Sequence, residues 1–154
     1  MIPTRTIRDA LLADLNGSGI FEKVMAHKDA DLGAALEHLR DYPSSIAVVV
    51  PGEDKFEHTY EPGTNTPIRT ECRNGFELLV SARELDMRED GAVDSLTFKD
   101  QVLDRVLWST LGVPNLVCMP LQCEPMIITF EDARNTKGRE AWKITLEMRH
   151  DYEG

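Results

Sequence analysis

Residues 142–150 alternate bulky and polar side chains, and this pattern constrains the fold more than any other feature of the chain. A period of two is typical of a strand with one buried and one exposed face, so the chain must contain a sheet and a layer that covers it. His150, the last residue of the buried side, is interpreted as a structural histidine. The tail after Arg149 is expected to be dispensable. The buried side comprises Trp142, Ile144, Leu146, Met148 and His150.

Three other stretches repeat apolar residues at the three- and four-residue spacing of helices. The first begins at a capping threonine, Thr4 or Thr6. The second spans residues 31–40. The third, residues 97–111, starts with a threonine that can cap it and carries a wide apolar stripe that includes Trp108. An apolar stripe of this width is expected to lie flat against a sheet.

Extended segments alternate with these helices. Residues 46–50 are apolar and mostly β-branched, which predicts a central strand or one covered on both faces. Residues 51–67 are rich in turn formers and predict a long polar loop. Residues 68–83 predict one long strand with a bend at Gly75, although a hairpin turn at this point is the alternative. Residues 119–130 predict another strand, whose prolines suit an edge or a bulge.

Residues 131–140 are charged and predict a projecting hairpin connection between the last two strands. The resulting order of elements is helix, helix, strand, strand, helix, strand, strand. It indicates an α+β fold, a two-layer sandwich in which helices pack on one face of a mostly antiparallel sheet. A chain of 154 residues with no visible linker is expected to form a single domain over residues 1–154.

The charge balance restricts the partners of the chain. The 27 acidic and 17 basic residues give a formal net charge of -10, which disfavours tight binding to a phosphate backbone. This charge is still compatible with DNA that moves past the protein without binding to it. No apolar run approaches the roughly 18 residues of a membrane span, and no signal peptide is visible, so a soluble cytoplasmic protein is expected. Three cysteines without a paired spacing indicate reduced thiols: Cys72, Cys118 and Cys123.

No sequence motif indicates catalysis, a metal or a cofactor. Phosphate-binding glycine loops and the common hydrolase motifs are missing. His38 lies between Glu37 and Asp41, but charged residues on an amphipathic helix usually form its solvated face. The acidic stretch that includes Glu53 and Glu57 lacks the register of a calcium loop. The missing motifs favour a protein that is not an enzyme, and an unrecognised hydrolase is kept as an alternative.

The order of elements resembles that of phage tail-terminator proteins, which form a ring at the head-proximal end of the tail tube. The stretches that carry the resemblance are "TIRDALLADL", "IAVVV", "FELLVSARE", "TFKDQVLDRVLWSTL" and the closing "ITLEMRHDY". They are patterns of residue types that extend over most of the chain. Residues 51–67 are longer than the family plan requires.

The resemblance implies a structural virion protein that assembles, as about six copies, into a closed ring. This ring would stop tube polymerisation and dock the tail to the head connector, with the tail-tube protein and the neck protein as partners and DNA as passing cargo. A neck, head-completion or tail-tube subunit is the nearest alternative, and a small acidic inhibitor or binding module is the alternative of another class. The candidate residues for the subunit interface are Glu131, Asp132, Arg134, Lys137, Arg139 and Glu140.

Overall fold

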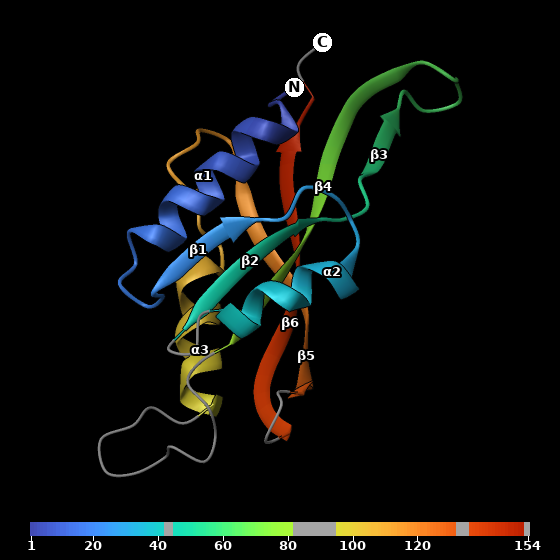
Figure 1. Ribbon diagram of the computed structural model, residues 1–154. Helices are drawn as coiled ribbons and strands as arrows, with labels where there is room; N and C mark the ends of the chain where they lie inside the picture. The colour runs from blue at the N-terminus through green and yellow to red at the C-terminus, as the bar shows by residue number, and fades with distance from the viewer. Residues whose placement is uncertain (42–44, 82–94, 132–135, 153–154) are drawn as a thin grey trace.

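A computed structural model describes residues 1–41, 45–81, 95–131 and 136–152 of the chain (Figure 1). The helices are α1 (Thr4–Asn16), α2 (Leu32–Leu36), the short 3-10 helix η1 (Glu37–Asp41) and α3 (Ser95–Val106). The strands are β1 (Lys23–Ala26), β2 (Ile46–Pro51), β3 (Lys55–Tyr60), β4 (Pro67–Ser81), β5 (Val117–Glu131) and β6 (Thr136–Asp151).

The six strands form one sheet in the order β1-β2-β4-β6-β5, and β3 pairs with the first half of β4. Only the pair β1 and β2 is parallel. The expected α+β fold with a mostly antiparallel sheet is therefore confirmed. The long strand β4 passes through Gly75 without a hairpin turn, as expected. Two strands were not expected: β1, which is only four residues long, and β3, which lies inside the predicted loop.

The expectation that the helices share one face of the sheet is correct for α1 and α3 and wrong for α2. Helices α1 and α3 pack on the sheet face that carries Ala47, Val49 and Ile144. Helix α2 and η1 pack on the opposite face, against Ile46 and Val48. Both faces of β2 are therefore covered, which explains its continuous apolar sequence.

Leu79 shows why the second layer forms. It interrupts the polar side of β4, and its side chain is 1% exposed beneath α2, next to Ala35 and Leu39. We predict that Leu79→Ala lowers the free energy of unfolding by about 3 kcal/mol, because a cavity is left between the sheet and α2. Urea unfolding followed by circular dichroism measures this loss. Ile68→Ala is the control: Ile68 is 63% exposed, so its truncation should change the stability by less than about 0.5 kcal/mol.

The boundaries of α1 and α3 differ from the expected ones. Thr4 lies inside α1, which follows Pro3 and has no side-chain cap. Asp31 caps α2, since its carboxylate accepts a hydrogen bond from the Ala34 backbone N–H at 3.1 Å. Helix α3 ends at Val106, and Trp108 turns away from the core with a positive φ of 58° and 69% exposure. Trp108 is therefore not part of the buried stripe.

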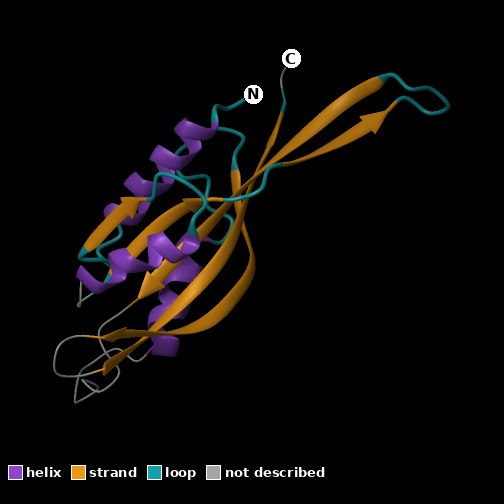
Figure 2. Cartoon of the chain, turned by 45° about the vertical axis from the view of Figure 1, so that its right-hand side comes forward, coloured by secondary structure: helices purple, strands orange, loops and turns teal. Residues whose placement is uncertain are grey.

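The predicted loop at residues 51–67 is an ordered two-stranded arm. Strand β3 and residues 67–73 of β4 pair in antiparallel fashion from Lys55, opposite Arg73, to Tyr60, opposite Pro67. We call this arm the ribbon (residues 55–73). Figures 1 and 2 show that it extends away from the helices, on the side of the molecule opposite to the far end of β5 and β6. It is the most exposed ordered part of the described chain, because all six residues of β3 are exposed.

Candidate functional site

The four histidines make structural contacts. Nδ1 of His27 and Nε2 of His38 lie 3.1 Å apart, where β1 ends beside η1. His58 shares a hydrogen bond of 2.8 Å with the hydroxyl of Thr70 across the ribbon. Among the described residues, no group of three or more His, Cys, Asp or Glu side chains is arranged to hold a metal ion. The three cysteines are free, and burial raises the pKa of Cys118 to about 12.

One face of the ribbon is charged and paired within the subunit. Arg73 contacts the carboxylates of Glu57 and Glu71, the latter at 2.7 Å. Arg69 binds Asp151 at the end of β6, also at 2.7 Å. These hydrogen bonds raise the pKa of both arginines above its ordinary value. Because its charges are already partnered, this face can remain in water without a further binding partner.

The other face of the ribbon is apolar and aromatic. The side chains of Phe56, His58 and Tyr60 alternate with the charged ones, and the rings of His58 and Tyr60 lie 6.3 Å apart. Ile68 lies two residues before Thr70 on β4, at the irregularity where the register between β3 and β4 shifts. Phe56 is 55% exposed, Tyr60 50% and Ile68 63%. A cluster of exposed apolar side chains on a projecting strand pair is typical of a protein interaction site.

The base of the ribbon is attached firmly to the sheet. The Tyr152 backbone N–H donates to the Thr70 carbonyl at 2.8 Å. His150 is 3% exposed, and its Nε2 lies 2.8 Å from Oδ1 of Asn74 on β4. The interpretation of His150 as a structural histidine is therefore confirmed. The expectation that residues after Arg149 are dispensable is wrong, because this segment connects β6 to the ribbon.

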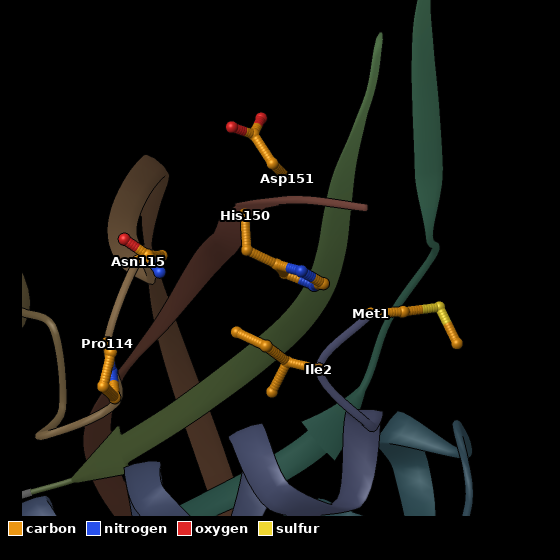
Figure 3. Close-up of a pocket in the computed structure, with 6 residues that line it drawn as sticks. All are labelled: Met1, Ile2, Pro114, Asn115, His150 and Asp151. Carbon is orange, nitrogen blue, oxygen red and sulfur yellow. The ribbon is translucent and has the colours of Figure 1, made fainter. Parts of the chain in front are cut away.

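A pocket of about 270 Å³ lies beside this base. Figure 3 shows that it is formed by Met1 and Ile2 before α1, by Pro114 and Asn115, and by the end of β6. The carboxylate of Asp151 points away from the ring of His150 (Figure 3). Burial lowers the pKa of His150 below its ordinary value of 6.5, and the positive N-terminus adds to this shift. The ring is therefore favoured in its neutral form.

The lowered pKa of His150 predicts a pH-dependent stability. Because the unfolded state binds the proton more readily, the contribution of His150 is complete above about pH 6.5, the ordinary value, and is lost as the pH falls. We predict that His150→Gln gives a smaller decrease in the free energy of unfolding between pH 7 and pH 5 than the wild type. Equal slopes for wild type and His150→Gln would contradict this assignment.

The structure assigns the predicted interface residues at 131–140 mainly to strands. Glu131 ends β5, and Lys137, Arg139 and Glu140 lie in β6, with Lys137 opposite Phe130 and Arg139 opposite Ile128. Asp132 and Arg134 lie outside the described residues. The ladder between β5 and β6 thus continues through most of the predicted connection. The paired part of this hairpin is longer than expected, because residues 136–140 pair as a strand.

Sequence reasoning missed the ribbon, although "KFEHTY" contains the signal. Phe56, His58 and Tyr60 alternate with polar residues over six positions. This is the same period-two pattern that identifies β6. The many turn formers on either side of this segment concealed it.

The sequence matches no family model, and no curated protein matches it significantly. In the part of the chain that the structure describes, no helix is long and apolar enough to cross a membrane. The ribbon and its contacts are therefore the main guide to function.

Proposed function

We propose that this protein is a structural subunit that assembles through its ribbon into the ring that ends a phage tail tube. The ribbon is the observation that carries the proposal. It extends away from the helices, its base is bonded to β6, and Phe56, Tyr60 and Ile68 are exposed on it. Burying these three side chains between subunits would be favourable by about 1.5–3 kcal/mol each. A subunit with no such partner would leave this surface in water.

The order of elements and the charge support a tail terminator among the possible assemblies. The α+β fold contains the five stretches that resemble this family. The net charge of -10 suits a conduit through which DNA slides without binding. In this function the protein catalyses no reaction, contacts the tail-tube protein and the head connector, and moves from the host cytoplasm into the virion.

The proposal is tested by the double variant Phe56→Asp/Tyr60→Asp. We predict that wild-type protein forms rings of about six subunits, seen by light scattering and electron microscopy. The double variant should stay monomeric at concentrations at least 100-fold above the wild-type assembly range, because about 3 kcal/mol or more of interface burial is lost. Thr59→Asp, on the charged face of the same strand, is the matched control and should assemble.

The same measurement separates the alternatives. A tail-tube subunit would form open fibres, since its repeated contact does not close. An acidic inhibitor or binding module would be monomeric or dimeric in the wild type. A wild type that stays monomeric and does not bind tail tubes would overturn the proposed function.

A further inference from the structure

Strands β1 and β3 each have an edge that is not paired with any described residue. The outer edge of β5 is partly paired, because the Trp108 N–H donates to the Cys118 carbonyl and the Cys118 N–H donates to the Ser109 carbonyl. The edge of β5 is poorly suited to pairing, because it contains Pro120 and Pro125 and an irregularity at Leu121. Neither β1 nor β3 contains proline or an irregularity along its first four residues. These two edges can therefore accept another strand.

The edge of β1 has the hydrogen-bonding groups that such pairing needs. The Lys23 backbone N–H donates to the Ser45 carbonyl, just before β2, at 3.3 Å. The His27 N–H donates to the Val49 carbonyl of β2 at 2.9 Å. The backbone groups of successive residues in a strand point to opposite sides, so the N–H and C=O groups of Val24 and Ala26 point to the open side of β1. Two residues thus offer four backbone groups to a neighbouring strand.

A groove of about 540 Å³ runs along this edge, between β1 and α1. Leu12, Ala13 and Asn16 line it from α1, and Val24 and Ala26 line it from β1. Leu12 and Val24 are partly buried and pack against the core beneath α1, so they give the groove apolar surface. Asn16 and Lys23 also line it, and polar groups form the larger part of its exposed lining. A strand added to β1 would place every second side chain in this groove.

The side chains of β3 suit a strand that is added beside β1, on both faces of the sheet. Phe56, His58 and Tyr60 would enter the groove under α1, where apolar and aromatic groups fit. Glu57 would then lie on the other side of the sheet. Lys23 of β1 is on that side, since it alternates with Val24 and shares its face with Met25, which packs toward α2. Glu57, which Arg73 of its own subunit already contacts, would thus lie on the same side as Lys23, whose charge is opposite.

We propose that β3 of one subunit adds to the open edge of β1 in a second copy of this chain, with Phe56 and Tyr60 seated in the groove under α1. The inference rests on the proposed function and names the contact through which its ring forms. Because donor and acceptor are different surfaces, the contact is head-to-tail and repeats from subunit to subunit. A contact of this kind generates a ring when its rotation closes. It would join the sheets of neighbouring subunits edge to edge.

A mixing experiment tests this contact. Ala26→Pro removes one outward N–H of β1 and keeps the inward hydrogen bonds, so it blocks the acceptor edge. Phe56→Asp/Tyr60→Asp blocks the donor. Each variant alone should be monomeric, with its apparent Kd raised at least 10-fold and its circular dichroism unchanged. An equimolar mixture should form dimers, because one intact donor and one intact acceptor remain.

The outcomes distinguish this inference from the proposed function. Rings of wild-type protein together with rings of folded Ala26→Pro would overturn the β1 contact and leave the proposed function standing. A mixture that stays monomeric would also overturn it. A wild type that is itself monomeric would overturn both.

Disulfide trapping gives a second readout if Ala26→Pro does not fold. Subunits with Ala26→Cys are mixed with subunits carrying a single cysteine at Phe56, His58 or Tyr60, all in a Cys123→Ser background. At least one pair should form a cross-linked dimer on mild oxidation. Val117→Cys, on the edge of β5, is the control acceptor and should form none. Cross-linking to Val117→Cys alone would contradict the assignment of the acceptor edge.

Discussion

Gly75→Ala is expected to lower the free energy of unfolding by about 3 kcal/mol or more, although it adds only one methyl group. A Cβ atom at this position would lie 2.3 Å from the Glu53 carbonyl oxygen and 3.0 Å from the Glu53 nitrogen. Both are backbone atoms, which cannot rotate away as a side chain can. The chain between β2 and β3 would have to move. Urea unfolding measures the loss.

The structure explains why the backbone approaches so closely at Gly75. Pro51 pairs with Phe76 and Lys55 with Arg73, so three residues of the connection lie opposite two of β4. The extra residue bulges toward β4, and the Gly52 backbone N–H donates to the Gly75 carbonyl at 2.9 Å. This crossing is where the ribbon leaves the sheet.

Gly33→Ala is the matched control for Gly75→Ala. Gly33 lies in α2, and a Cβ there would meet only the Asp31 carboxylate, at 3.4 Å. Alanine is the better helix former by about 1 kcal/mol, so this variant should be as stable as the wild type or more stable. If Gly75→Ala and the wild type unfold at the same urea concentration, the close approach of the Glu53 backbone to Gly75 is contradicted.

The second large effect is expected for Ile144→Asp, which should prevent folding under ordinary conditions. Ile144 is fully buried near the middle of β6, between Leu78 of β4 and Cys123 of β5. The change removes a buried apolar side chain and introduces a carboxylate with no partner in the core. The combined cost of about 5 kcal/mol or more is comparable to the total stability of a typical domain. Circular dichroism and soluble yield measure the outcome.

Two variants separate the effect of the charge from other causes. Ile144→Val retains an apolar side chain and should cost about 1 kcal/mol. Ile68→Asp makes the same chemical change at an exposed site of the ribbon and should leave the monomer folded. A folded Ile144→Asp with wild-type stability would show that β6 is not in the core.

The elements with strong periodicity could be predicted from the sequence. The closing strand, the helix at Ile7 to Leu15 and the run at residues 46–50 all have a pattern that depends on their own residues. The α+β class follows from their order. Strand β1 escaped prediction because four residues are too few to show a period, and it forms only by pairing with β2.

The candidate site was harder to predict than the fold. The charges at residues 131–140 drew attention to the far hairpin, whereas the exposed apolar face lies on the ribbon at Phe56 and Tyr60. Sequence could have shown the alternation in "KFEHTY" but not that it faces solvent. Exposure depends on whether another element covers that face, and none of the described elements does.

The sequence by itself determined that this chain forms a sheet with amphipathic strands and helices, because each of those patterns is local. Only the tertiary structure decided that α2 covers the second face, where Leu79 lies, and that β3 and the start of β4 extend away from the helices. It also placed His150 against Asn74, 76 positions apart in the chain. Contacts between distant segments depend on the packing of the whole domain, and no local period encodes them.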